Sequence, residues 1–396
     1  MKGSFLFPLI LAVNACVPAS QPGVVTRAAM EPSISSLPPM KSFGAHSPTT
    51  VPKSNNDLSL DFIELAFRME SGKDLSVLTR FEGPVSIRVT GAPPPTLRPD
   101  LSRLINRLRT EAGVDISPTD APGANITVEA VSRSKIRNVL PQAACFVAPN
   151  VGSLDEYKRA RRSPQTNWSL MTTRTRVAIF VPNDASPQEV RDCLHEEIAQ
   201  ALGPLNDLYR LPDSVFNDDN VHTVLTGFDM MILRAFYDPA LKSGMSRGQV
   251  ANALPGIFAR INPGGTSTRP RFATRTPREW NAAVQGALGP GRTDGQRQDA
   301  AYSASKIAQS LGWQDHRRAF AHYAMGRALQ SGDAEAAHKQ YLMADLFYSR
   351  NPGTDLHRAY VATQLAAYAI SKADGAEALR IIGPHIETAR YRENAA

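Results

Sequence analysis

Cysteine is scarce in this sequence of 396 residues, which contains three in all. So few cysteines exclude a small secreted fold held together by a disulfide framework. Long apolar runs are also missing, which excludes a polytopic membrane protein because each spanning helix needs about 20 such residues. Hydrophobic residues make up 42% of the chain and charged residues 20%. This balance is typical of globular proteins and excludes disordered or collagen-like chains.

A strong charge of one sign is absent too. Lysine and arginine number 44 against 37 aspartates and glutamates, for a net charge of +7. The excess is spread thinly along the chain, so we expect no nucleic-acid partner. On an exported protein, scattered arginines suit a negatively charged envelope surface better. The length predicts two to three domains at roughly 150 residues each.

The N-terminus is typical of an export signal. Lys2 precedes an apolar run over 5–13, which is too short to cross a bilayer as a helix. The predicted signal peptide, residues 1–15, is followed by Cys16. Residues 13–16 read Val-Asn-Ala-Cys, which resembles a bacterial lipobox, whose cysteine carries the lipid. The alternative is an ordinary signal peptide with a chance cysteine. Because Val17 is not the aspartate that retains many lipoproteins inside, we expect a periplasm-facing lipoprotein in the outer rather than the inner membrane.

A tether rich in proline, serine and threonine follows at 16–56, and the next domain is predicted at 57–262. Val85, Ile87 and Val89 alternate with polar residues, which indicates a half-buried strand. Apolar residues after Pro99 recur at helical spacing until Gly113. Further strands are predicted at 126–130, 144–147 and 177–181. The fold class of this domain is therefore α+β.

A second helix has strong start and stop signals. Ser186 is the predicted N-cap, a proline follows at the first helical position, and Glu189 at the third completes a capping box. Gly203 ends the helix. Cys193 lies in this helix, and Cys145 lies in the strand at 144–147. In an oxidising compartment these two cysteines are expected to form a disulfide. The alternative is two free thiols in the core.

The same helix carries a motif related to those of zinc peptidases, which place two histidines four residues apart with a glutamate beside the first. A register that starts at His195 fails, because Ala199 then falls at the second ligand position. A register one residue later fits the spacing of H-E-x-x-H-x-x-G-x-x-H. Its ligand, base, ligand, glycine and ligand positions are Glu196, Glu197, Gln200, Gly203 and Asn206.

Two resemblances follow from these residues. The order of strand, helix, strands and capped helix is similar to the zincin fold, and Leu225–Tyr237 resembles the closing helix of matrixin-like metzincins. The stretch 60–245 also resembles an uncharacterised family of proteobacterial envelope lipoproteins, domain of unknown function 2927. Its hallmark is E-E-x-x-Q-A-L-G followed by N-D, here 196–203 and Asn217-Asp218. That family has no assigned activity, so the likeness implies a fold and a location.

The replaced ligands change the expected chemistry. Glu196, Gln200 and Asn206 offer a metal only oxygen, which suits calcium or magnesium better than zinc. We expect no cofactor, and a divalent cation is the alternative. Glu197 lies on the apolar stripe of the helix, where a carboxylate must be paired, metal-bound or protonated. It is either a retained general base or a buried glutamate bonded to backbone or to an arginine, for which Arg88 and Arg234 are candidates.

The C-terminal part divides into a linker at 263–298, interrupted by a short helical pattern around Trp280 to Leu288, and a helical region at 299–396. In and beside the linker, Arg269, Arg271, Arg275 and Arg278 either form a solvated loop or meet phosphate, lipid headgroups or glycan acids. The helical region is rich in alanine and broken by short Gly-Asp turns, which resembles tetratricopeptide (TPR) hairpins. A plain helical bundle is the alternative.

These patterns together favour a lipid-anchored envelope protein with a metzincin-like domain that binds rather than cleaves. Its expected partner is an envelope protein or a peptidoglycan-associated one, and the lipid anchor holds it at the membrane. The competing hypothesis is an atypical metal-dependent hydrolase or peptidase in which Glu197 is the general base.

Overall fold

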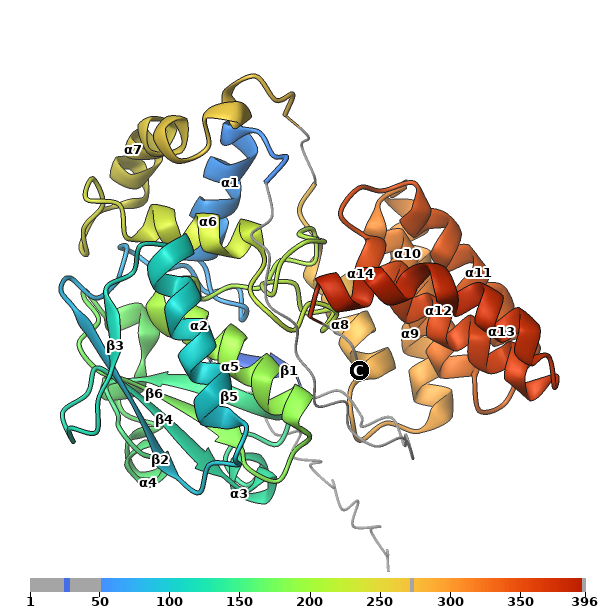
Figure 1. The fold of residues 1–396 in the computed structure, drawn as a ribbon, viewed down its shortest axis with the longest axis horizontal. Coiled ribbons are helices and arrows are strands. Elements are labelled where there is room, and N and C mark those ends of the chain that lie inside the picture. Colours follow the sequence, from blue (N-terminus) through green and yellow to red (C-terminus); the bar gives the residue numbers. More distant parts are fainter. Residues whose placement is uncertain (1–24, 29–50, 271–273, 394–396) are drawn as a thin grey trace, which may run out of the picture.

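The computed structural model describes residues 25–28, 51–270 and 274–393, so the predicted signal segment and Cys16 lie outside the described residues. A mixed α/β part with one sheet lies beside a part made only of helices (Figure 1). None of the helices in the described ranges is both long and apolar enough to cross a membrane.

The sheet is mixed and has the order β1-β5-β6-β4-β2-β3. Strands β3, β2, β4 and β6 run parallel, β5 pairs antiparallel with β6, and β1 pairs antiparallel with the outer edge of β5. The strands are β1 (Val25–Ala28), β2 (Val85–Gly91), β3 (Ile116–Pro118), β4 (Ile126–Val131), β5 (Ala143–Pro149) and β6 (Val177–Pro182). The four strands predicted by alternation and apolar runs are therefore confirmed, whereas the short β1 and β3 carry no such signal.

Helices cover both faces of this sheet. Along β6, Val177, Ile179 and Val181 join the core beneath α2 and α5, whereas Ala178 and Phe180 pack in a second core with residues of α3 and α4. A strand buried on both faces needs a continuous apolar run, which is what β6 has. The covering helices are α2 (Leu97–Glu111), α3 (Arg133–Arg137), α4 (Leu154–Ala160) and α5 (Pro187–Leu202).

The start of α5 follows the predicted cap in part. The Ser186 side chain accepts a hydrogen bond from the backbone N–H of Glu189. The second half of the expected capping box is wrong, because the Glu189 carboxylate pairs with Arg133 at 2.8 Å instead. At the other end, a Cβ on Gly203 would lie 2.8 Å from the ring of Phe236, so only glycine allows this close approach.

Three more helices pack at the end of the sheet domain where the chain leaves α5 (Figure 1). They are α1 (Asn55–Ala66), α6 (Gly227–Phe236) and α7 (Arg247–Ile261). Helix α1 begins at Asn55, because the side chain of Ser54 caps it by accepting a hydrogen bond from the backbone N–H of Asp57. This start lies five residues before Leu60, the first residue of the stretch 60–245. The chain between α5 and α6 contains no helix or strand and runs toward the helical part.

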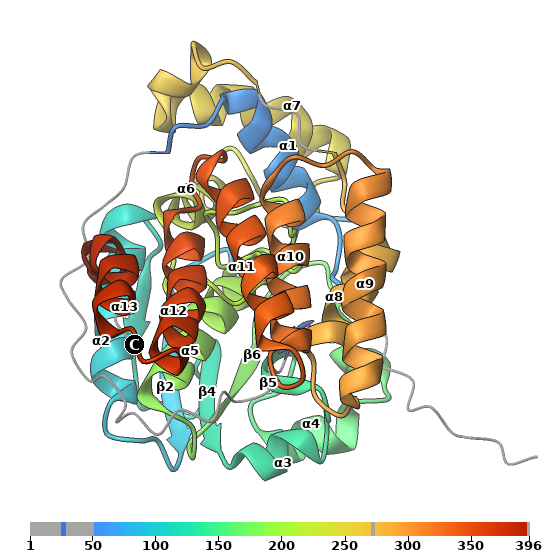
Figure 2. The ribbon, with the colours of Figure 1, turned by 90° about the vertical axis from the view of Figure 1, so that its right-hand side faces the viewer.

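The helical part is an array in which each helix from α8 to α12 packs on the next, whereas α14 packs on α12 (Figure 2). Its members are α8 (Arg278–Leu288), α9 (Asp294–Ser310), α10 (His316–Leu329), α11 (Ala334–Ser349), α12 (Asp355–Ser371), α13 (Gly375–Ile382) and α14 (Ile386–Tyr391). Single 3₁₀ turns occur at Pro164–Thr166, Trp168–Leu170, Pro263–Thr266 and Gly383–His385. Helix α8 and the start of α9 lie inside the stretch 263–298 that the composition assigns to a linker. Helix α8 forms part of the helical array because its Trp280 is fully buried in the core of the helical part.

The segment between α5 and α6 joins the two parts. Tyr209 enters the aromatic core of the helical part beside Trp280 and Phe320. Its backbone carbonyl lies 2.5 Å from Nε2 of His316, and Asp219 pairs with His357 at 2.8 Å. The contact is therefore built from both apolar and polar groups of this one segment.

Candidate functional site

The motif helix α5 is closed to solvent on every side. All its residues from Val190 to Leu202 are buried. Glu197 and Gln200 are 0% exposed, Glu196 is 7% exposed and the nearby Asn206 is 4% exposed. The structure thus keeps the four predicted motif positions together in one region but gives none of them an open face to a substrate.

The donor set at these positions does not fit a zinc ion. The Asn206 amide donates to the backbone carbonyl of Glu64 at 3.0 Å. Neither amide atom of Gln200 has a hydrogen-bond partner among the described residues. In the described part of the chain, no group of three or more histidine, cysteine, aspartate or glutamate side chains is placed to hold a metal. One carboxylate and two amides are a weak zinc donor set.

Of the two arginines considered as partners of Glu197, one has another partner and the other is exposed. Arg88 donates to the Thr127 hydroxyl at 3.1 Å, and Arg234 lies on the exposed side of α6. Glu197 sits among the buried residues of α5, where bulk water cannot reach its carboxyl group. A general base must lie within hydrogen-bond reach of the proton that it removes, directly or through one water. The closed surroundings of Glu197 do not offer that access.

Glu196 belongs to a group of carboxyl side chains. Burial, and then the neighbouring carboxylates of Asp207, Asp218 and Glu196, raise the pKa of Glu70 well above its ordinary value. A raised pKa of this origin means that burial and the neighbouring carboxylates disfavour the charged form of Glu70. Two of these carboxyls, Asp207 and Asp218, belong to Asn-Asp pairs at 206–207 and 217–218, and this repeated pair is the pattern by which the sequence could have pointed to them.

The C-terminal end of α5 is closed by Arg174, which the sequence reasoning missed. Its guanidinium donates to the carbonyls of Gln200, Ala201 and Gly203 at 2.5, 2.7 and 2.5 Å. These carbonyls have no partner within the helix, and a cation at this end also meets the negative pole of the helix dipole. Burial lowers the pKa of Arg174 to about 10, so it remains charged at neutral pH. An isolated arginine in a loop carries no sequence signal for such a role.

The two histidines near the motif are core residues with backbone partners. Nδ1 of His195 accepts from the N–H of Leu225 at 3.1 Å, and Nε2 of His222 lies 2.9 Å from the carbonyl of Pro212. Burial, together with the charges of His357 and Arg392, lowers the pKa of His222 to about 3. His222 is therefore neutral and bonded within the fold.

The predicted disulfide between Cys145 and Cys193 is confirmed. It joins the antiparallel strand β5 to the middle of α5. The motif helix is thus fixed to the sheet by a covalent bond as well as by packing.

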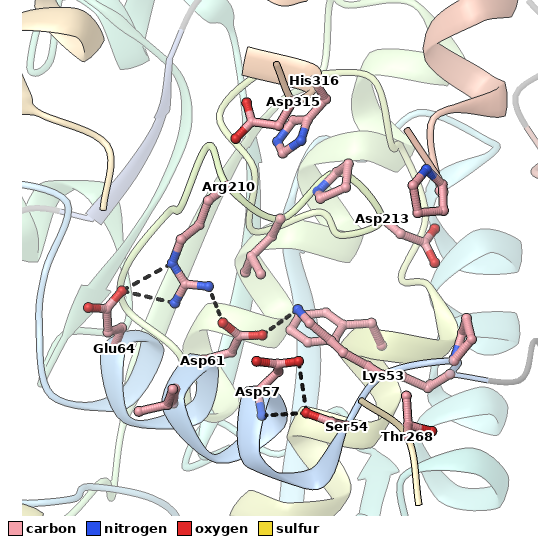
Figure 3. Close-up of a pocket in the computed structure, with 18 of the residues that line it drawn as sticks. Lys53, Ser54, Asp57, Asp61, Glu64, Arg210, Asp213, Thr268, Asp315 and His316 are labelled. Atoms are coloured by element: carbon pink, nitrogen blue, oxygen red, sulfur yellow. Dashed lines mark hydrogen bonds and ion pairs between the residues drawn. The ribbon is translucent and has the colours of Figure 1, made fainter. Parts of the chain in front are cut away.

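An open cavity of about 590 Å³ lies where the sheet domain meets the helical part (Figure 3). Its described lining comes from five stretches of chain, none of which contains a residue of the predicted metal motif. They are 51–64, 210–213, the loop that holds Thr268, Arg269 and Arg275, and, from the helical part, 315–316 and 351–353; Phe228 and Arg247 complete the lining. A cavity of this size between two structural units is a typical place for a small ligand.

One wall of the cavity is an ion-pair network. Figure 3 shows the guanidinium of Arg210 between the carboxylates of Asp61 and Glu64, with Lys53 on the other side of Asp61. Arg275 adds a second cation to Glu64 at 2.6 Å. Although burial opposes it, Arg210 and Arg275 hold the pKa of Glu64 below its ordinary value. Glu64 is therefore a carboxylate at neutral pH.

Comparison with known proteins gives a family and no activity. The family described as protein of unknown function (DUF2927) matches residues 55–256, which is about half of the chain. The match runs from the first residue of α1 into α7 and ends before the helical part. No curated protein and no solved structure matches the chain.

Proposed function

The chain belongs to the DUF2927 family, and we propose that it is a non-catalytic binding protein of the cell envelope, with a zincin-like domain and a TPR-like helical region. The single observation that carries this proposal is the closure of α5. Every residue from Val190 to Leu202 is buried, and Glu197 is 0% exposed. A peptidase must bring a peptide bond and a water to its base, and this helix has no surface for either.

The element order supports the zincin-like part of the proposal. A strand, a helix, further strands and then the capped motif helix follow one another as the resemblance implies. The likeness of the helical region to TPR hairpins is supported by α10 to α13, in which consecutive helices pack on each other and short turns separate them. Helical-repeat surfaces commonly bind peptides or proteins.

The location is proposed from the sequence. Residues 1–15 and Cys16 match a lipoprotein signal. The predicted tether 16–56 would be limited to the residues between Cys16 and β1, because Val25–Ala28 already pairs with β5 in the sheet. The protein would face the periplasm, with the outer membrane preferred over the inner. Its partner would be an envelope protein or a peptidoglycan-associated one, held near the membrane by the anchor.

Metal content and peptidase activity test the non-catalytic part. Full-length protein purified from its native membrane is assayed by elemental analysis and by cleavage of an unfolded protein such as casein. We expect no stoichiometric metal, no cleavage, and no effect of Glu196→Ala or Glu197→Gln. Glu279→Ala, at an exposed glutamate of α8, is the matched control. A stoichiometric metal that Glu196→Ala removes would overturn the proposal in favour of a hydrolase with Glu197 as general base.

Membrane fractionation tests the anchor. The wild type is expected in the outer-membrane fraction and labelled by a fatty-acid probe, whereas Cys16→Ser is expected to lose the label and leave the membrane. Cys193→Ser controls for a general effect of losing a cysteine, since it retains Cys16. Membrane association of an unlabelled wild-type protein would contradict lipid anchoring.

A further inference from the structure

We propose that the cavity between α1 and the helical part binds a short acidic peptide with apolar side chains. This inference rests on the proposed binding function and names the ligand class of one site. The argument uses the charge balance of the cavity, its apolar surface and the hydrogen-bonding groups around it.

The cavity lining carries more positive than negative charge once the ion pairs are assigned. Two of its carboxylates are neutralised by cations outside the lining, Asp213 by Arg392 at 2.8 Å and Asp315 by Arg317 at 2.6 Å. The other lining carboxylates are Asp57, Asp61 and Glu64, and the lining cations are Lys53, Arg210, Arg247, Arg269 and Arg275. The cations exceed these carboxylates by two.

The excess is carried by Arg247 and Arg269, which line the cavity. In the ion-pair network, Asp61 and Glu64 already form ion pairs with three cations, which are Lys53, Arg210 and Arg275. Arg247 and Arg269 are exposed, and no ion pair of either appears within the described residues. A guanidinium offers a planar pair of donors that matches a carboxylate. An acidic group of a ligand would therefore complete the charge balance at these two arginines.

Apolar side chains form the remainder of the surface. Leu60 is 49% exposed, which is unusual for a leucine on a helix whose other face is core, and it lines the cavity with Ile63 and Phe228. The ammonium of Lys53 lies 4.5 Å from the centre of the Phe228 ring. A ligand with apolar groups would remove this surface from water, which favours binding.

A peptide fits these groups better than a fatty acid of the same charge. The side chain of Asp213 is 29% exposed, and its ion pair with Arg392 uses Oδ1, so Oδ2 can accept a hydrogen bond from a ligand. Backbone N–H groups of a peptide supply such donors, whereas an alkyl chain supplies none. The cavity volume lies in the range of about 300–1,000 Å³ that is usual for small-ligand sites.

Fluorescence anisotropy with purified full-length protein tests the proposal. The probe is a labelled pentapeptide of alternating leucine and glutamate. Its counterparts carry glutamine or lysine in place of glutamate, and dodecanoate is the competitor that represents a fatty acid. We expect the glutamate peptide to bind, the glutamine peptide to bind about tenfold more weakly, and the lysine peptide and dodecanoate to have no effect.

A pair of double variants locates the binding. The double variant Arg247→Ala/Arg269→Ala is expected to bind the glutamate peptide with about tenfold lower affinity, because each exposed arginine contributes roughly 0.5–1 kcal/mol to binding. Arg137→Ala with Arg162→Ala removes the same charge from the opposite end of the domain, near α3 and α4, and is expected to change nothing (Figure 1). Circular dichroism verifies that all variants are folded.

Each other result overturns the inference. Absence of binding at millimolar peptide refutes the site, and equal effects of the two double variants refute its location. Displacement of the peptide by dodecanoate, or binding of dodecanoate alone, refutes the ligand class. The metal and peptidase measurements decide the non-catalytic proposal separately, since neither uses the cavity.

Discussion

The phenol ring of Tyr209 packs edge-on against the indole of Trp280, with the ring centres 5.0 Å apart. Tyr209 belongs to the segment that follows the motif helix, and Trp280 belongs to the first helix of the helical part. Both rings are buried, and the Tyr209 hydroxyl donates to Asp218 at 2.9 Å. This pair therefore connects the family domain to the array of helices.

Replacing Tyr209 by alanine is expected to lower the free energy of unfolding by about 3–5 kcal/mol, the cost of a large-to-small change at a buried aromatic. Urea unfolding followed by tryptophan fluorescence measures the effect, since Trp280 and Trp313 both lie in this core. Tyr302→Ala is the control, because Tyr302 is 57% exposed and its loss should cost less than about 0.5 kcal/mol. A loss at Tyr209 no larger than the control would refute the role of this pair.

Replacing Arg174 by glutamine is expected to destabilise the protein by about 3 kcal/mol or more. The change removes the donors to three carbonyls at the end of α5 and leaves these buried groups without partners. Arg176→Gln is a close control, because Arg176 is 47% exposed and its ion pair with Glu156 should contribute less than about 1 kcal/mol. Thermal unfolding of both variants decides the comparison, and equal shifts would contradict the special role of Arg174.

Removing the disulfide with Cys145→Ser and Cys193→Ser is expected to lower the free energy of unfolding by about 4 kcal/mol. The bond closes a loop with a sequence separation of 48, which restricts the unfolded chain. Reductant should lower the stability of the wild type by a similar amount and leave the double variant unchanged. Sensitivity of the double variant to reductant would show that the effect has another source.

Stability is expected to fall as the pH falls below about 6.5, partly because of His316. Burial lowers the pKa of His316 to about 4, whereas an unfolded histidine titrates near 6.5. Between these values the unfolded state binds a proton that the folded state does not, so the stabilisation is complete above pH ~6.5 and is lost toward pH ~4. The loss amounts to about 3 kcal/mol, from roughly 1.4 kcal/mol per unit of pKa.

Asp229 opposes this trend. Burial raises its pKa to about 6, so its contribution favours the folded state more as the pH falls from about 6 toward 4. The measurement is therefore the difference between the wild type and His316→Gln at each pH, in which Asp229 cancels. That difference should shrink by about 3 kcal/mol between pH 7 and 4. A difference independent of pH would contradict the assignment.

Local sequence patterns were sufficient for most of the sheet domain. Alternation predicted β2 and β4, an apolar run predicted β6, and Ser186 with Gly203 fixed the ends of α5. These features depend on residues a few positions apart, so the chain encodes them directly. Composition was less reliable at the linker, where buried Trp280 draws α8 into the helical core.

The sequence by itself determined the family resemblance, the cysteine pairing and the burial of the motif face of α5. Only the tertiary structure decided that α5 is buried all round from Val190 to Leu202, that Arg174 satisfies its C-terminal end, and that distant segments line a charged cavity. The physical reason is sequence separation. Arg275 and Glu64 are 211 residues apart, and no local pattern records an ion pair that forms only when distant segments pack together.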